Sequence, residues 1–218
     1  MNTVLFLFFR AVSILANGQV YKMYSTRNIH NQLRLNTATG EVMQIQDDGQ
    51  SWIIGETIEA SGKIEGRYSL SETRNMWTFI LLDTFTGKTW QVQYSTKSTE
   101  YMFCIPINYY SLAFPTEESN WTNRFQLFAT QNMWTFILLD SYQGRLWQVQ
   151  YSSSDLENLI CIPINNTALV GDSNRCIFTI HPLTSMFQFY LINESNGDMW
   201  KFQWSTKGDD YRWIEKFN

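Results

Sequence analysis

Few residues of this chain have the type and spacing that catalysis needs. The two histidines, His30 and His181, lie in unrelated contexts, and neither is near a serine or cysteine motif. The three cysteines lack the spacing of metal ligands, and they are Cys104, Cys161 and Cys176. Because catalysis requires a nucleophile or a pair of acids in a defined cleft, we predict no catalytic residue, no metal, no cofactor and no enzyme activity.

The acidic residues are better explained as turn and loop residues than as catalytic acids. Asp83 and Asp140 each stand four positions before a glycine, where a carboxylate caps a hairpin turn. A calcium site would need more oxygen ligands at fixed spacing. Glu117 and Glu118 lie in a polar loop, so we expect them to be solvated.

Aromatic residues are the best candidates for ligand contacts. Repeated tryptophans such as Trp77 and Trp134 recur beside aliphatic runs, so we expect them in the core, with His30 as a packed substitute at the same place. Repeated glutamines such as Gln91 are expected to bond backbone groups between units. Aromatic residues specific to one copy are more suitable for binding. The candidates are Trp52, Tyr101, Tyr109, Tyr110, Trp121 and Tyr142.

Internal repeats dominate the sequence. The segment NMWTFILLD occurs at 75–83 and again at 132–140, and 25 of the 43 positions that start at Gly66 and at Asn123 are identical. Two weaker copies precede and follow this pair. The repeats span approximately 19–65, 66–122, 123–175 and 176–218. We therefore expect a single four-repeat domain over 19–218.

Each repeat predicts four short strands. In the second repeat these are 67–71, 76–82, 88–94 and 102–107. The second strand is apolar on both faces, so it must be covered on both sides. No segment shows the 3.6-residue period of a helix.

Four such units predict an all-β, four-bladed β-propeller of four-stranded antiparallel repeats. Blades that lean on one another in a circle would bury their apolar faces. The unit size and count resemble the hemopexin-like propellers, a resemblance that carries over no functional residue. A β-barrel or a two-sheet repeat assembly is the alternative fold.

The amino terminus, residues 1–18, has the short apolar run of a secretory signal peptide. Its small-residue junction before Gln19 resembles the export signals of Bacteroidetes-type bacteria. Cleavage would make the protein periplasmic or secreted, and retention would leave it cytoplasmic as part of the fold. The stretch 4–16 has thirteen residues and is interrupted by Arg10, so it is too short for a membrane span of about 20 residues.

Composition and charge restrict the partners. The net charge is −4 and no basic patch is present, which argues against nucleic-acid binding. We predict a non-catalytic module that binds a protein or a glycan through loops on one propeller face. The alternatives are an immunity-type protein that neutralises a toxin, and a glycoside hydrolase or lyase on a propeller scaffold. The sequence does not determine the oligomeric state.

Overall fold

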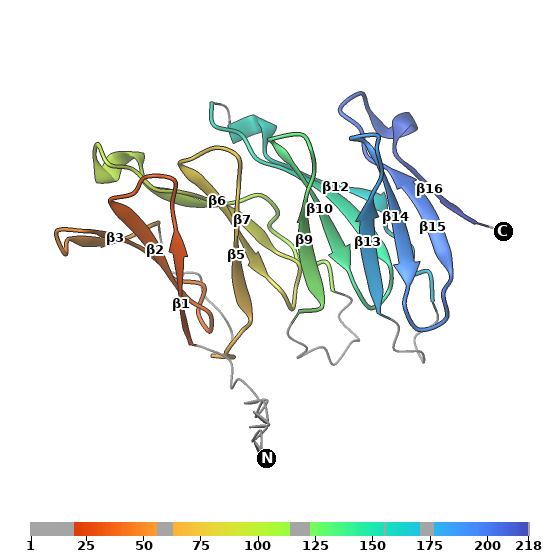
Figure 1. Ribbon diagram of the computed structural model, residues 1–218, viewed down its shortest axis with the longest axis horizontal. Helices are drawn as coiled ribbons and strands as arrows, with labels where there is room; N and C mark the ends of the chain where they lie inside the picture. The colour runs from red at the N-terminus through yellow and green to blue at the C-terminus, as the bar shows by residue number, and fades with distance from the viewer. Residues whose placement is uncertain (1–19, 56–62, 114–122, 155, 171–176, 218) are drawn as a thin grey trace, which may run out of the picture.

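The computed structural model describes residues 20–55, 63–113, 123–154, 156–170 and 177–217 (Figure 1). The described chain is all-β, with four antiparallel four-stranded sheets, and each sheet corresponds to one repeat. We call these sheets blades 1 to 4 in chain order. The prediction of an all-β, propeller-like assembly of four repeated blades is confirmed.

The strands pair in sequence order within every blade. Blade 1 contains β1 (Tyr21–Ser25), β2 (Asn31–Asn36), β3 (Val42–Gln46) and β4 (Ser51–Ile53). Blade 2 contains β5 (Tyr68–Glu72), β6 (Thr78–Asp83), β7 (Thr89–Gln93) and β8 (Phe103–Pro106). Blade 3 contains β9 (Phe125–Ala129), β10 (Thr135–Asp140), β11 (Arg145–Gln150) and β12 (Ile160–Asn165). Blade 4 contains β13 (Phe178–Pro182), β14 (Gln188–Asn193), β15 (Met199–Gln203) and β16 (Trp213–Lys216).

Short 3₁₀ turns separate the third and fourth strands of the last three blades. They are η1 (Thr99–Tyr101), η2 (Leu156–Asn158) and η3 (Asp209–Tyr211), and all three lie at the upper edge in Figure 1. We call this the upper rim. The loops between the first and second strands of each blade lie at the same rim, because the strands alternate in direction. The described residues contain no long apolar helix that could cross a bilayer.

The core is divided among the contacts between consecutive blades. Leu33 of blade 1 packs in one cluster with Leu81 of blade 2, and Ile80 of blade 2 packs with Leu138 of blade 3. A third cluster joins blades 3 and 4. The middle strands β6 and β10 are therefore buried at every position, as their double-sided apolar pattern predicts.

The blades form an open arc, whereas we expected them to meet in a circle. The first and last blades lie at opposite ends in Figure 1, and the three described core clusters all join blades that are consecutive in sequence. The physical reason is visible at the two ends. Arg34 of blade 1 and Lys201 of blade 4 occupy positions where blade 2 has Leu81 and Gln91. Because a charged side chain is solvated favourably, the outward faces of blades 1 and 4 can stay exposed to solvent without a covering blade.

Two buried ion-pair clusters support the turns of the middle blades. The Asp83 carboxylate accepts hydrogen bonds from the Arg67 side chain at 2.7 and 3.0 Å, and from the backbone N–H of Phe85 at 3.0 Å. Asp140 pairs with both Arg124 and Arg145. The predicted turn caps are thus confirmed. Arg67 and Arg124 lie 16 residues before their aspartates and Arg145 lies five residues after Asp140, and turn chemistry alone predicts none of these pairs.

Candidate functional site

The copy-specific chemistry of this protein lies at the upper rim of blade 1. The loop before β2 places His30 beside Asp47, which follows β3. His30 Nδ1 lies 3.0 Å from Asp47 Oδ2. The Asp47 backbone N–H also donates to the His30 carbonyl at 3.1 Å, so backbone bonding holds the two segments together.

In the other three blades, the same two positions hold an aromatic pair. The pairs are Trp77 with Tyr94, Trp134 with Tyr151, and Phe187 with Trp204, with ring centroids 5.3, 5.2 and 4.9 Å apart. These aromatic rings pack against the preceding blade. In blade 1 an acid–base pair replaces them.

The expectation that His30 packs as a substitute for tryptophan is wrong. Its side chain is 72% exposed and that of Asp47 is 61% exposed. Blade 1 has no preceding blade in the described chain. The side chains at this position therefore have no apolar surroundings there, and a polar pair is accommodated. The repeat alignment placed His30 correctly, but it did not reveal the missing neighbour.

An open cavity of about 380 Å³ adjoins the pair. It is lined by Asn28, His30, Asn31, Gln46, Asp47, Asp48 and Thr96. Thr96 comes from blade 2, so the cavity lies between two blades. A cavity at the equivalent place between blades 3 and 4 has Trp134 and Tyr151 where this one has His30 and Asp47.

The geometry is that of a general base held by a carboxylate. In the tautomer in which Nδ1 carries the proton, Nδ1–H donates to Asp47 and Nε2 is left as the basic nitrogen. The Asn28 Oδ1 accepts the backbone N–H of His30 at 3.0 Å, which orients the loop. Such a pair can take a proton from water beside a bound carbonyl compound.

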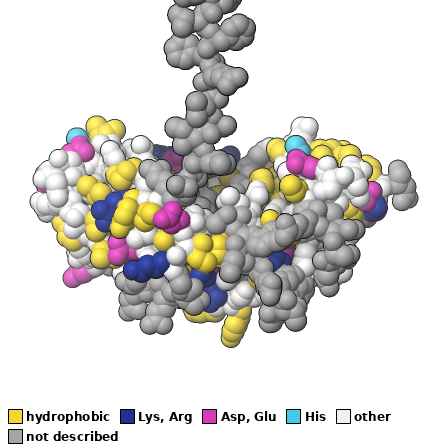
Figure 2. Space-filling model, turned by 90° about the horizontal axis from the view of Figure 1, so that it is seen from below, with side chains coloured by type: hydrophobic (Ala, Val, Ile, Leu, Met, Phe, Trp, Pro, Cys, Tyr) yellow, Lys and Arg dark blue, Asp and Glu magenta, His cyan; other side chains and the backbone are white. Residues whose placement is uncertain are grey.

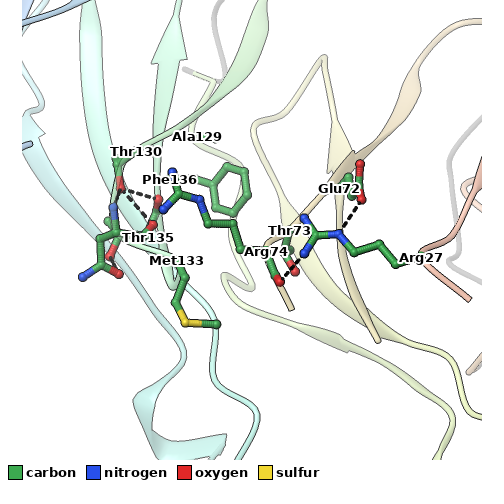
Figure 3. Close-up of a pocket in the computed structure, with 10 residues that line it drawn as sticks. Arg27, Glu72, Thr73, Arg74, Ala129, Thr130, Met133, Thr135 and Phe136 are labelled. Atoms are coloured by element: carbon green, nitrogen blue, oxygen red, sulfur yellow. Dashed lines mark hydrogen bonds and ion pairs between the residues drawn. The ribbon is translucent and has the colours of Figure 1, made fainter. Parts of the chain in front are cut away.

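A second pocket lies at the same rim between blades 1, 2 and 3 (Figure 3). Arg27 Nε lies 3.1 Å from Glu72 Oε1, and Arg27 Nη1 donates to the Arg74 carbonyl at 2.7 Å. Arg74 Nη1 donates in turn to the Gln131 carbonyl. These bonds join the loops of three blades, and the pocket measures only about 90 Å³. Its guanidinium groups thus act mainly as links between blades.

The aromatic residues predicted to bind a ligand are dispersed. Trp52 lies on β4, Tyr101 in η1, and Tyr142 in the turn after β10. Tyr109 and Tyr110 follow β8 and are 70% and 83% exposed. None of these five lines the cavity beside His30 or the pocket of Figure 3. Trp121 lies outside the described residues, as do Glu117 and Glu118, and a binding role for the six aromatic residues stays a prediction.

The repeated tryptophans and glutamines have the structural roles that we predicted. Trp147 and Trp200 are 3% and 6% exposed. Three further repeated tryptophans are only partly buried against the core clusters, and they are Trp77, Trp90 and Trp134. Gln91 Nε2 donates to the Ser152 carbonyl at 2.7 Å, and its Oε1 accepts the Ser152 backbone N–H at 3.1 Å. This exchange of bonds links blade 2 to blade 3.

Comparisons with known proteins concern the fold. No family model and no curated protein matches this chain. Among solved structures, the chain is similar to the periplasmic gluconolactonase of Pseudomonas aeruginosa, with a TM-score of 0.50 and 10% identity over 90% of this chain and 56% of the other. An auxiliary nutrient binding protein of Bacteroides thetaiotaomicron gives a TM-score of 0.44 and 9% identity over 91% and 41%. The chain therefore spans about half the length of these structures.

The comparison corrects the prediction of a non-catalytic binding module and of no enzyme activity. A neighbour of the same fold is a gluconolactonase. Our prediction relied on the absence of a local catalytic motif. That argument fails for a propeller-like fold, since loops from different strands and blades bring acid–base groups together without any contiguous motif.

Proposed function

We propose that this protein is a hydrolase that opens a neutral sugar lactone at the cavity beside His30. The observation that carries the proposal is the His30–Asp47 pair, which replaces an aromatic pair in one blade only and adjoins a cavity of about 380 Å³. The likeness in fold to a gluconolactonase supports the same class of reaction.

The side chains around the cavity define the substrate. Asp47 and Asp48 are acidic and no lysine or arginine lines the cavity among the described residues, so a phosphorylated or carboxylated ligand would be repelled. Carboxylates accept hydrogen bonds from sugar hydroxyls, and amide side chains both accept hydrogen bonds from them and donate to them. A neutral polyhydroxylated lactone thus fits better than its phosphorylated form.

The reaction needs one general base and one water molecule. Nε2 of His30 takes a proton from water as the water oxygen attacks the lactone carbonyl carbon, and Asp47 stabilises the imidazolium that forms. The ring C–O bond then breaks, and the proton held by His30 passes to the leaving alkoxide. The products are a hydroxy acid and regenerated neutral His30. A glycosidase would instead need two carboxylates that flank the scissile bond.

We expect His30→Gln and Asp47→Asn to abolish lactonase activity without loss of fold. The measurement is the rate of acid release from glucono-δ-lactone in a pH-stat, above the spontaneous rate, with 6-phosphogluconolactone as the charged comparison. Removal of a general base lowers the rate by about 10²–10⁴-fold.

His181→Gln is the matched control, because His181 lies in blade 4 and has Thr179 as its side-chain partner. It should keep the wild-type rate. Wild-type protein that does not exceed the spontaneous rate with either lactone would overturn the proposal, as would full activity in His30→Gln.

Export stays a prediction. Residues 1–18 lie outside the described residues, and so does the proposed cleavage junction.

A further inference from the structure

The outward face of blade 1 has apolar side chains that no other blade covers among the described residues. A row of directly paired residues crosses the sheet from Met23 through Arg34 and Met43 to Ile53. Met23 is 52% exposed and Ile53 is 49% exposed. The equivalent row in the other blades packs against the preceding blade, which explains why this face is largely apolar.

The outward face of blade 4 is the counterpart. Tyr190, Ile192 and Met199 occupy the positions at which blade 1 uses Leu33, Leu35 and Val42 to pack against blade 2. Phe217 is 48% exposed and contacts Tyr190 with ring centroids 5.4 Å apart. This face thus has the residues of an inter-blade contact, and no other blade of the described chain covers it.

On the two outward faces, oppositely charged residues occupy the positions that form glutamine–serine hydrogen bonds at the inner contacts. At every inner contact, a glutamine of the third strand bonds the backbone of the next blade. The contacts are Gln44 with Ser95, Gln91 with Ser152, and Gln148 with Ser205. At the glutamine position blade 4 has Lys201, and at the serine position blade 1 has Asp48, which is exposed. If blade 4 of one chain met blade 1 of another, a cation would face an anion.

The number of blades in each chain limits the number of copies in a ring. The chain aligns with 56% of the gluconolactonase chain, so the four blades cover only part of that structure. Figure 2 shows the described side chains gathered in two flanks. Two arcs of this kind would hold eight blades, within the usual range of about 4–8 for propellers.

We propose that two copies of this chain close an eight-bladed ring, in which blade 4 of each copy packs on blade 1 of the other. Lys201 of one copy then donates to Asp48 of the other at both junctions. A twofold axis through the centre of the ring relates the copies, and the contact closes without leaving an open end. The test of this proposal is separate from that of the hydrolase proposal, although Asp48 also lines the cavity beside His30, so the junction would bring Lys201 of the second copy to the edge of that cavity.

The first test is the mass of the full chain in solution by size-exclusion chromatography with light scattering, at micromolar concentration and low salt. We expect a dimer of twice 25.7 kDa. A monomer at all accessible concentrations would overturn the proposal. Larger open-ended polymers would also overturn it, because they would show that the arc does not close.

The second test reverses the two charges separately. Asp48→Lys and Lys201→Glu each place like charges at both junctions of a homodimer, so each variant alone should weaken dimerisation by at least about tenfold. A mixture of the two variants forms a heterodimer in which both junctions have opposite charges. Mixing should therefore restore the dimer.

The circular dichroism spectrum of each variant should match that of the wild type, since both positions are at the surface. Failure of the mixture to dimerise, or unchanged dimerisation of each single variant, would exclude the proposed junction. Lys207→Glu serves as the control, because it changes a surface charge of blade 4 away from this face and should leave the dimer intact.

Discussion

At the residue scale, the same repeat position has opposite properties in different blades. Gln91 is fully buried and exchanges two hydrogen bonds with Ser152, whereas its counterpart Lys201 is partly exposed. His30 likewise replaces Trp77. In each case the type of side chain corresponds to the surroundings of its position. The end blades have polar groups where the middle blades have apolar or amide groups.

The two described cysteines give a residue-scale prediction. Burial raises the pKa of the Cys104 and Cys161 thiols to about 12 from the usual 9.0. At pH 8 the thiolate fraction is then about a thousandfold lower than for a free thiol, and the thiolate is the reactive form. In a Cys176→Ser variant, we expect Ellman's reagent to modify neither thiol in the native protein and both in denaturant.

The raised pKa of these thiols also affects alkaline stability. Above pH 9 the unfolded chain releases thiol protons that the folded chain retains, so the free energy of unfolding should fall as the pH rises from about 9 towards about 12. Rapid labelling of the native protein at pH 8 would contradict the raised pKa of the Cys104 and Cys161 thiols.

At the scale of the elements, hydrogen bonds between blades complement the apolar packing. Gln91→Met keeps the length and apolar stem of the side chain but leaves the Ser152 carbonyl and N–H without these partners. We expect a loss of about 2–4 kcal/mol in the free energy of unfolding, measured by urea denaturation, because unpaired buried polar groups are costly.

Gln93→Met is the matched control for this prediction. Gln93 lies on the same strand β7, and its side chain donates only to the Tyr101 carbonyl at an exposed site. Its effect should stay within about 0.5 kcal/mol, as is usual for surface changes. Equal effects of the two substitutions would contradict the role assigned to the inter-blade glutamines.

At the scale of the whole molecule, the arc behaves as a one-dimensional array in which each blade contacts its neighbours. The middle blades have two such contacts and the end blades have one. The burial of the second strands reflects this difference, since β6 and β10 are buried throughout whereas β2 and β14 alternate between buried and partly exposed positions.

We therefore predict that the end blades open first. In the Lys201→Glu variant, in which we expect weakened dimerisation, the backbone amides of β2 and β14 should exchange hydrogen at least about tenfold faster than those of β6 and β10. Hydrogen exchange with mass spectrometry measures this directly. Uniform protection across the four blades would mean that the array unfolds as a single cooperative unit.

The sequence by itself determined the all-β class, the four repeats, the strand order within each repeat and the core role of residues such as Trp147. These features are local or periodic, so side-chain alternation and self-similarity reveal them. Only the tertiary structure decided that the blades form an open arc, that Asp140 binds two buried arginines, and that His30 faces Asp47 in a cavity. Each of these depends on which surfaces meet in space, and a repeat alignment shows equivalent positions without showing whether a neighbour is present.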